Sequence, residues 1–317
     1  NISGKSGGIM TLETIVQKLS PIEARINEPI QKYTTFKVGG PVDLFVIVKN
    51  RNELQSALQI ITQAGLAWMV IGKGSNLLIT DDGLEGAVVF LDGEFKSNRI
   101  SEKNMLYCGA GMELSEVSEL AFHHGYTGSE FAIGIPGSFG GGVFMNAGAY
   151  DGEVSSIIHE VEWMSESGEI QNFSKEHCCF EYRKSFFQKK KGVILGATLS
   201  LDSGNPDEIK FKMDDLTEKR NTKQPLEWPS AGSTFKRPPG YFAGTLIQEA
   251  GLKGFVLGGA QVSEKHAGFV INANEAKAED ILNLMDHIRK QVFEYAQVWL
   301  VPEVRILGRS SEKWQFL

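Results

Sequence analysis

The sequence predicts an α+β protein built from two main parts, and three observations support this fold class. Strand-like apolar runs and amphipathic helix-like segments are mixed, without the strict alternation that a doubly wound sheet requires. The chain has 317 residues, enough for two domains that each bury a core. Turn-forming residues at 203–206 mark a boundary. We therefore expect a first region over 10–204, with subdomains at roughly 10–92 and 93–204, and a second domain over 205–308.

The elements of the first region are predicted from the spacing of apolar residues and from glycines that end segments. Residues 11–32 begin with a helix and continue as an irregular link. The segment 52–64 places Leu54, Leu58 and Ile61 on one helical face, and Gly65 ends it. The other predicted elements are a helix over 113–124 and strands over 42–48, 66–71, 77–79, 87–91, 105–110, 157–164, 169–173 and 193–201, of which 157–164 and 169–173 form a hairpin.

The second domain is predicted to contain three helices and a final strand. A charged helix covers 207–219, and another begins at residue 246 and stops at Gly251. The helix over 278–295 has the clearest pattern, because apolar residues such as Ile281 and Ile288 recur on one side. We expect the last strand over 298–307, and a tail over 309–317.

Composition and charge exclude several classes of function. The formal net charge of −7 argues against nonspecific nucleic-acid binding, which depends on neutralising phosphates. No apolar run approaches the length of a membrane span. The cysteines form no CxxC pair and no metal-site spacing occurs, so we expect no metal and a reducing, cytoplasmic location. Residues 1–9 lack the apolar core of a secretory signal, and we expect an expression remnant before Met10.

Two glycine-rich stretches dominate the functional interpretation. Residues 133–150 read IGIPGSFGGGVFMNAGAY, and residues 72–77 read GKGSNL directly after a predicted strand. Glycine lets the backbone bend sharply and approach a ligand closely, and consecutive N–H groups can form a concave anion site suited to a diphosphate. Our interpretation is that both loops hold one dinucleotide. A tight structural turn is the alternative for either loop alone.

Two better-known glycine motifs fit these stretches poorly. A Rossmann fingerprint needs a third glycine where Leu77 stands, followed by a helix and a partner carboxylate. A hydrolase elbow of the G-x-S-x-G type needs a glycine where Pro136 stands. The two loops therefore require a different kind of dinucleotide site.

GKGSNLL over 72–78 together with IPGSFGGGVFMNAGAY over 135–150 resembles FAD-binding domains of the vanillyl-alcohol-oxidase type. Four later motifs, YRKS at 182–185, AGSTF at 231–235, GGAQVS at 258–263 and PEVR at 302–305, narrow the resemblance to the bacterial UDP-N-acetylenolpyruvoylglucosamine reductases. It covers about 33–307. It implies a two-part FAD-binding region followed by a smaller α+β substrate-binding domain. The gap of 220 − 183 = 37 residues between Arg183 and Arg220 resembles the subtype that lacks a substrate-covering tyrosine loop.

The resemblance implies an activity and its partners. NADPH reduces FAD, and hydride then passes to an enolpyruvyl ether, giving UDP-N-acetylmuramate for peptidoglycan synthesis. Because no histidine lies within 66–78, we expect FAD to be noncovalent. NADPH and a sugar nucleotide are the expected small-molecule partners, with no role for nucleic acid or a membrane. An oxidase that passes electrons to oxygen and a nucleotide-binding module without catalysis are the two alternatives.

The resemblance also assigns residues, each by its place in a matching motif. The catalytic positions are Arg183, which stabilises negative charge through a carboxylate grip, Ser233, the proton donor, and Glu303. The positions for FAD are Tyr33, Gly72, Lys73, Gly74, Ser75, Asn76, Leu77, Ile135, Pro136, Gly137, Ser138, Gly140, Gly141, Asn146, Gly148 and Ala149. Those for the substrate are Arg220, Lys223, Arg237, Lys253 and His266.

Each catalytic residue type also has an ordinary structural explanation. Arg183 lies near the basic run 189–191 and could be a surface arginine, and a serine such as Ser233 is most often a cap or turn residue. Glu303 could form an ion pair with Arg305 or another cation, and His266 could be structural. Only the surrounding motifs favour catalysis and substrate binding.

Overall fold

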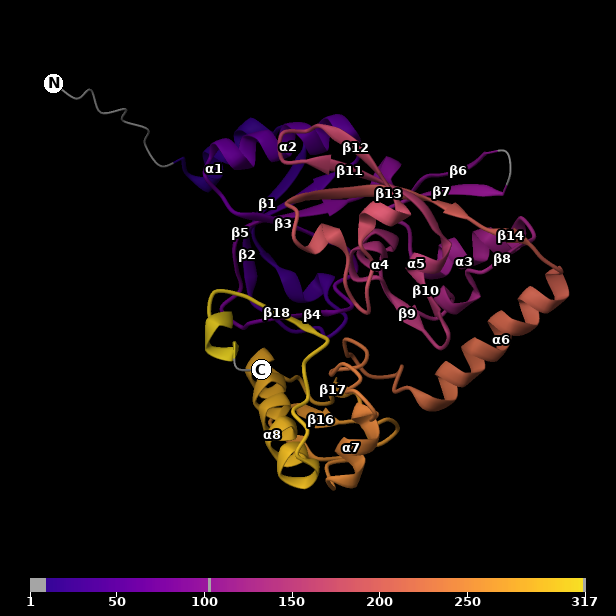
Figure 1. Ribbon diagram of the computed structural model, residues 1–317. Helices are drawn as coiled ribbons and strands as arrows, with labels where there is room; N and C mark the ends of the chain where they lie inside the picture. Colours follow the sequence, from indigo (N-terminus) through magenta and orange to yellow (C-terminus); the bar gives the residue numbers. More distant parts are fainter. Residues whose placement is uncertain (1–9, 102–103, 316–317) are drawn as a thin grey trace.

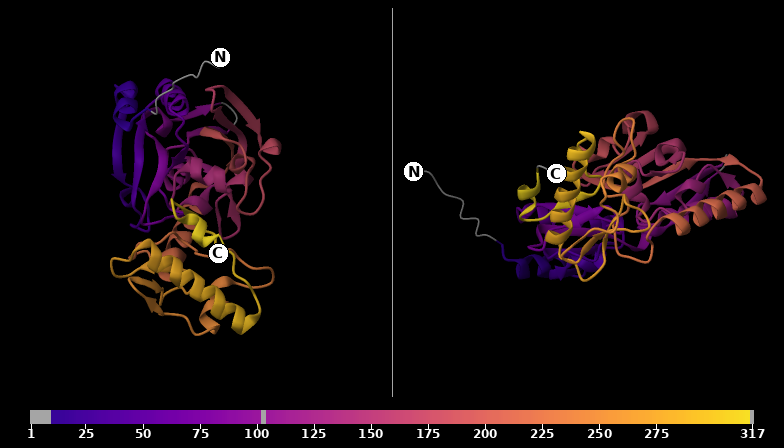
Figure 2. Two further views of the ribbon diagram at one scale, coloured as in Figure 1. Left: turned by 90° about the vertical axis from the view of Figure 1, so that its left-hand side faces the viewer. Right: turned by 90° about the horizontal axis from the view of Figure 1, so that it is seen from below.

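A computed structural model describes residues 10–101 and 104–315 and confirms the α+β fold class (Figure 1). The first region contains two sheets with their helices, and a smaller domain, orange to yellow, lies below them. The same two-part arrangement is visible from the side in Figure 2. The expected remnant over 1–9 lies outside the described residues.

The first sheet has the strand order β1-β2-β5-β3. Strand β5 is parallel to β2 and β3, and β1 is antiparallel to β2. Two helices pack beside it, and each begins at a capping side chain, Thr11 for α1 and Asn50 for α2. The bounds are α1 (Leu12–Leu19), β1 (Glu23–Pro29), η1 (Ile30–Tyr33), β2 (Pro41–Val48), α2 (Arg51–Gln63), β3 (Trp68–Ile71), β5 (Leu84–Leu91) and η2 (Gly93–Lys96).

The second sheet is antiparallel, with the order β12-β11-β13-β7-β6. It shares one hydrophobic core with the first sheet, because Val46 and Val89 of one and Val161 and Leu199 of the other belong to the same buried cluster. The bounds are β6 (Asn98–Ser101), β7 (Met105–Gly109), α3 (Leu114–His123), β8 (Tyr126–Thr127), η3 (Glu130–Ala132), α4 (Phe139–Met145), β9 (Gly148–Ala149), β10 (Gly152–Glu153), α5 (Val154–Ile157), β11 (Ile158–Ser165), β12 (Ile170–Ser174), η4 (Lys175–Cys178), η5 (Phe186–Gln188), β13 (Gly192–Ser200) and β14 (Asp202–Ser203).

The C-terminal domain packs a small antiparallel sheet against its longest helix. Its core includes Phe36, Val38 and Leu78 from the first region, so the two parts are joined through apolar packing. The chain also returns to the first region, where β18 pairs in parallel with β4. The bounds are β4 (Leu77–Ile79), α7 (Ala243–Glu249), β15 (Val256–Leu257), β16 (Ala260–Val262), β17 (Val270–Asn272), α8 (Ala278–Ala296), β18 (Arg305–Leu307) and η6 (Ser311–Trp314).

Helix α6 (Pro206–Lys223) connects the two parts and runs along the right of Figure 1. Asn205 caps it, and Ile209, Met213 and Leu216 are buried. It packs against α3, β8 and η3 of the first region, and its last turn leads into the second. The interval from Arg183 to Arg220 is filled by η5, β13, β14 and this helix. The domain boundary at residue 205 stays a prediction.

Three local expectations differ clearly from the structure, and the helix expected from residue 246 begins earlier, at Ala243. The link after α1 contains strand β1, whose polar sequence conceals it because only one of its residues is buried. The strand expected over 298–307 is limited to Arg305–Leu307, since only these residues pair with another strand, while Pro302 makes an isolated bridge to Phe235. The second glycine stretch contains helix α4, which begins after Ser138. The hairpin over β11 and β12 and the long helix α8 are confirmed.

Candidate active site

The two glycine stretches lie against each other. A Cβ on Gly72 would fall 1.9 Å from Ser138 Oγ, so only glycine allows this approach. Gly74 has φ +58°, and a Cβ there would meet the carbonyl oxygen of Tyr33 at 2.3 Å. The fold therefore brings together Tyr33 and the residues of both loops that were predicted to bind FAD. Such proximity is required if one ligand is to contact both loops.

Of the described backbone N–H groups in the two glycine stretches, those without a hydrogen-bond partner in the protein are found mainly in the first loop, 72–77. In α4, Phe139 N–H donates to Met112, Gly140 N–H to Ala110, and the N–H groups of the next two residues to Ser138. These donors are satisfied, which corrects the expectation that the run of glycines forms an anion nest. Among the described residues no acceptor faces the N–H groups of Lys73, Gly74, Ser75, Asn76, Gly137 and Ser138.

A neighbouring residue that the sequence did not single out adds a further donor. The Thr35 hydroxyl is buried, and no described residue bonds to it. Its backbone N–H donates to the carbonyl of Gly74 at 3.4 Å, so it lies beside the first loop. A phosphate or hydroxyl of a bound dinucleotide would satisfy both the loop N–H groups and this hydroxyl. The residues present therefore fit a dinucleotide.

Several predicted cofactor residues have clear structural partners. Asn146 is fully buried at φ +44°, and its amide donates to the carbonyl of Glu181 and accepts from Ser155 N–H. Gly140 packs against Ala110, where a Cβ would lie 2.7 Å from the alanine Cβ. Lys73 Nζ pairs with Glu113 at 2.5 Å. Contacts of these residues with the cofactor stay predictions.

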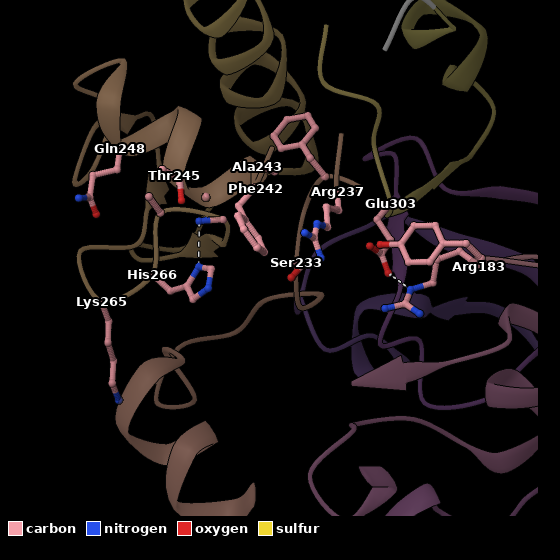
Figure 3. A pocket seen from close by; sticks show the side chains of 15 residues that line it. Arg183, Ser233, Arg237, Phe242, Ala243, Thr245, Gln248, Lys265, His266 and Glu303 are labelled. Carbon is pink, nitrogen blue, oxygen red and sulfur yellow. Dashed lines mark hydrogen bonds and ion pairs between the residues drawn. The ribbon is translucent and has the colours of Figure 1, made fainter. Parts of the chain in front are cut away.

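The three predicted catalytic residues line one cleft of about 450 Å³ (Figure 3). Arg183 comes from the first region, whereas Ser233 and Glu303 come from segments of the C-terminal part. Arg183 Nε donates to Glu303 Oε1 at 2.6 Å, and its Nη2 donates to the carbonyl of Gly148 at 3.0 Å. The full lining comprises Tyr182, Arg183, Ser233, Phe235, Arg237, Phe242, Ala243, Gly244, Thr245, Gln248, Lys265, His266, Ala267, Gly268 and Glu303.

Rigid backbone positions each of these side chains. Arg183 has φ +57° in a tight turn closed by two hydrogen bonds between Glu181 and Lys184. Ser233 precedes buried Thr234, which bonds to Gly268 and Val270. Glu303 N–H donates to the carbonyl of Thr234 at 2.9 Å, which links the segment of Glu303 to that of Ser233.

The structure decides between the two interpretations of Glu303 as an ion-pair partner. Its partner is Arg183 and not Arg305, whose guanidinium lies 5.0 Å from the centre of the Phe144 ring. Burial lowers the pKa of Arg305. Arg183 is not an isolated surface arginine either, because it is held by a carboxylate, a carbonyl and the face of Tyr182, 4.8 Å away.

The predicted substrate residues divide into two groups. Arg237 and His266 line the cleft, and Arg237 lies 4.0 Å from the centre of the Phe242 ring. Lys253 is not part of the lining, but its Nζ donates to the lining residue Gln248 at 3.3 Å.

Arg220 and Lys223 lie in the last turn of α6, outside the cleft lining. The side chain of Arg220 packs against Gly134 at the second glycine stretch, and burial lowers its pKa. Lys223 is exposed. Their contacts with substrate stay predictions, and they depend on how far a ligand extends beyond the cleft.

The His266 side chain lines the cleft and is fixed there by a hydrogen bond. Its Nδ1 accepts from Gly268 N–H at 3.0 Å, which requires that nitrogen to be unprotonated. Burial lowers the pKa of His266, and the nearby charge of Lys253 acts in the same direction. A neutral imidazole at this wall can donate through Nε2.

Sequence reasoning missed several polar and aromatic side chains that line the cleft. Lys265 donates to the carbonyl of Asn221 at 2.7 Å and so joins the end of α6 to the C-terminal domain. Its position beside His266 was the available signal. Tyr182 and Phe242 expose aromatic faces, and Gln248 reaches the rim from α7. Figure 3 labels Lys265, Phe242 and Gln248 among the side chains of the lining.

The described residues also bear on metal sites and on membrane spans. Within the described residues, no cluster of three or more His, Cys, Asp or Glu side chains could hold a metal ion. Over the same part of the chain, no helix has the length and apolar character needed to cross a membrane.

Comparisons with known proteins agree with this geometry. Residues 42–174 match the family model of an FAD binding domain, and residues 224–307 match the C-terminal domain of UDP-N-acetylenolpyruvoylglucosamine reductase. Reductases of that name from Caldanaerobacter subterraneus and Clostridium perfringens are 44% and 47% identical over 94% and 90% of this chain, covering 99% and 93% of their own lengths.

A solved structure supports the same assignment. The UDP-N-acetylenolpyruvylglucosamine reductase of Thermus caldophilus superposes with a TM-score of 0.76 at 33% identity, covering 90% of this chain and 98% of that one. Sequence, family models and fold thus agree over nearly the whole length. The chain belongs to the UDP-N-acetylenolpyruvoylglucosamine reductase family.

Proposed function

We propose that the cleft lined by Arg183, Ser233 and Glu303 is the active site of a reductase that converts UDP-N-acetylglucosamine enolpyruvate to UDP-N-acetylmuramate, a step of peptidoglycan precursor synthesis. The chain is an FAD-containing oxidoreductase with NADPH as reductant. The observation that carries the site assignment is the joining of the three side chains in one cleft from three distant segments.

The cofactor fits between the glycine loops and the cleft. The free N–H groups of Lys73 to Asn76, with Gly137, Ser138 and the Thr35 hydroxyl, would hold the diphosphate of FAD. Bound FAD supplies to the substrate the hydride that it receives from NADPH. The first loop contains no histidine that could attach it covalently, so the contacts are noncovalent.

The side chains of the cleft have distinct roles in our proposal. Arg183 binds the substrate carboxylate and stabilises the negative charge that grows on the adjacent carbon. The Ser233 hydroxyl delivers the proton to that carbon, and the nearby cation makes this weak acid effective. Glu303 orients Arg183 and borders the same carboxylate. Arg237, His266 and Lys265 lie along the wall where the sugar nucleotide extends.

A two-step flavin experiment tests this function against its alternatives. NADPH is added to the purified yellow protein without oxygen, and the flavin absorbance is followed before and after the enolpyruvyl nucleotide or air is added. A reductase is bleached by NADPH and reoxidised rapidly by the nucleotide. Rapid reoxidation by air alone would indicate an oxidase. A protein that binds nucleotide but is never bleached would be a binding module, and a protein that takes up no FAD would contradict the proposal.

A further inference from the structure

The Arg183–Glu303 ion pair uses the same guanidinium edge that a substrate carboxylate needs. Glu303 accepts from Nε and the Gly148 carbonyl from Nη2. Nε and Nη2 form one edge of the planar group, which can grip a carboxylate through two parallel hydrogen bonds. In this structure that edge is filled by groups of the protein itself.

The two partners of Arg183 differ in how easily they can move away. The carbonyl of Gly148 belongs to the backbone of β9, which pairs with β10. Glu303 offers only the end of a side chain, while its backbone is fixed by Thr234 and by Asn76 Nδ2. A rotation of the Glu303 side chain releases Arg183 without disturbing the main chain. Glu303 is therefore the partner that an incoming carboxylate displaces.

The ion pair is also well protected from water. The side chains of Arg183 and Glu303 are 17% and 15% exposed, whereas those of the neighbouring pair Lys184 and Glu181 are 60% and 69% exposed. Solvent and salt screen a protected pair less than an exposed one. A small free carboxylate must thus compete with an anion that is tethered at the site and effectively concentrated there.

A carboxylate carried by a larger ligand meets this competition differently. A nucleotide that is already bound along the wall of Arg237 and His266 presents its carboxylate intramolecularly, as Glu303 does. Arg305, the cation nearest in sequence, lies over Phe144, and no described cation other than Arg183 pairs with Glu303. The exchange therefore takes place at Arg183 alone.

We propose that Glu303 is an internal competitor for the carboxylate site on Arg183, so that only a carboxylate anchored elsewhere in the cleft displaces it from Nε. This role in specificity rests on the proposed function and is additional to any part of Glu303 in the chemistry. It implies that removing the Glu303 charge favours carboxylate-bearing ligands selectively.

Two nucleotides that differ in one carboxylate provide the test. The FAD-loaded wild type, Glu303→Gln and the control Glu181→Gln are titrated calorimetrically with UDP-N-acetylmuramate, which has the carboxylate, and with UDP-N-acetylglucosamine, which lacks it. Because close charge pairs couple strongly, Glu303→Gln is expected to bind the first nucleotide about tenfold more tightly than wild type and the second unchanged. Glu181→Gln should change neither. Sodium lactate, titrated in the absence of nucleotide, should also bind Glu303→Gln more tightly than wild type.

Each other outcome counts against a defined claim. Weaker binding of UDP-N-acetylmuramate by Glu303→Gln, or equal changes for both nucleotides, would overturn the competitor role while leaving the reductase proposal intact. A wild type that binds neither nucleotide would overturn both. If Glu303→Gln does not retain FAD, Glu303→Asp serves instead, because its shorter side chain withdraws the carboxylate from Nε and should shift the ratio in the same direction.

Discussion

Asn76 Nδ2 donates to the carbonyl oxygen of Glu303 at 3.1 Å, across 227 positions of sequence. The backbone of Asn76 also accepts from Arg305 N–H at 2.9 Å. The first glycine loop therefore fixes the segment that carries Glu303, so that cofactor loop and cleft are held by the same contacts. We expect changes in this loop to affect chemistry as well as FAD binding.

Asn76→Ala should slow substrate-dependent oxidation of the reduced flavin about tenfold while most FAD is retained. One hydrogen bond contributes about 1 kcal/mol net, and its loss lets the Glu303 backbone shift relative to Arg183. Stopped-flow absorbance gives the rate, and flavin content gives retention. Asn98→Ala on exposed strand β6 is the matched control. Loss of FAD at an unchanged rate per flavin would show that Asn76 serves the cofactor only.

Ser233→Ala should leave reduction of the flavin by NADPH unchanged and slow its reoxidation by the enolpyruvyl nucleotide by about 10²–10⁴-fold, the usual contribution of a positioned acid. The two half-reactions are measured separately without oxygen. Thr245→Ala, which removes another hydroxyl from the same cleft, is the control. Reoxidation at the wild-type rate would remove Ser233 from the proton-transfer step.

Gly74→Ala should weaken FAD binding and lower stability by more than Gly65→Ala. Both glycines have left-handed φ, +58° and +74°, so each substitution carries about 1–2 kcal/mol of backbone strain. Only at Gly74 does the added Cβ also meet the Tyr33 carbonyl, whereas nothing lies within 4 Å at Gly65. Denaturant unfolding and FAD titration measure the two effects. Equal FAD affinities in the two variants would contradict the close approach at the first loop.

Stability should fall in mildly acidic solution because of His266. Burial lowers the pKa of His266 below its ordinary value of 6.5, so the unfolded chain takes up this proton at a higher pH than the folded protein. His266 thus contributes stability that is present above pH 6.5 and is lost as pH falls through the folded pKa. As the pH falls from 7.5 to 5, the free energy of unfolding of wild type should therefore decrease more than that of His266→Gln. Exposed His159 gives the control variant His159→Gln, and an unchanged difference would contradict the cause assigned here.

Local signals account for the correct expectations. The hairpin over β11 and β12 and helix α8 have strong periodic patterns with clear turns or stops, so neighbours in sequence specify them. Strand β1 was missed because it lies at the edge of its sheet and its residues are mostly polar and not buried. The length of β18 depends on where β4 offers a partner, which no local pattern encodes.

The site shows the same division between local and distant information. Motifs singled out Arg183, Ser233 and Glu303, and the fold brings all three into one cleft. The choice of Arg183 over Arg305 as partner of Glu303 also required the fold. Glycine content suggested donors throughout 133–150, yet the N–H groups at the start of α4 are used within the protein. Arg220 and Lys223 match motif positions but extend from α6, outside the cleft lining.

The sequence by itself determined the fold class, the two glycine loops and some of the cleft side chains, Arg183, Ser233 and Glu303 among them, because composition, period and motif are properties of neighbouring residues. Only the tertiary structure decided which donors remain free, which cation faces Glu303, and that the first loop holds Glu303 through Asn76. These are contacts between distant segments, and they depend on how the two parts pack around a shared core. The first glycine loop is therefore tied directly to a segment that lines the cleft.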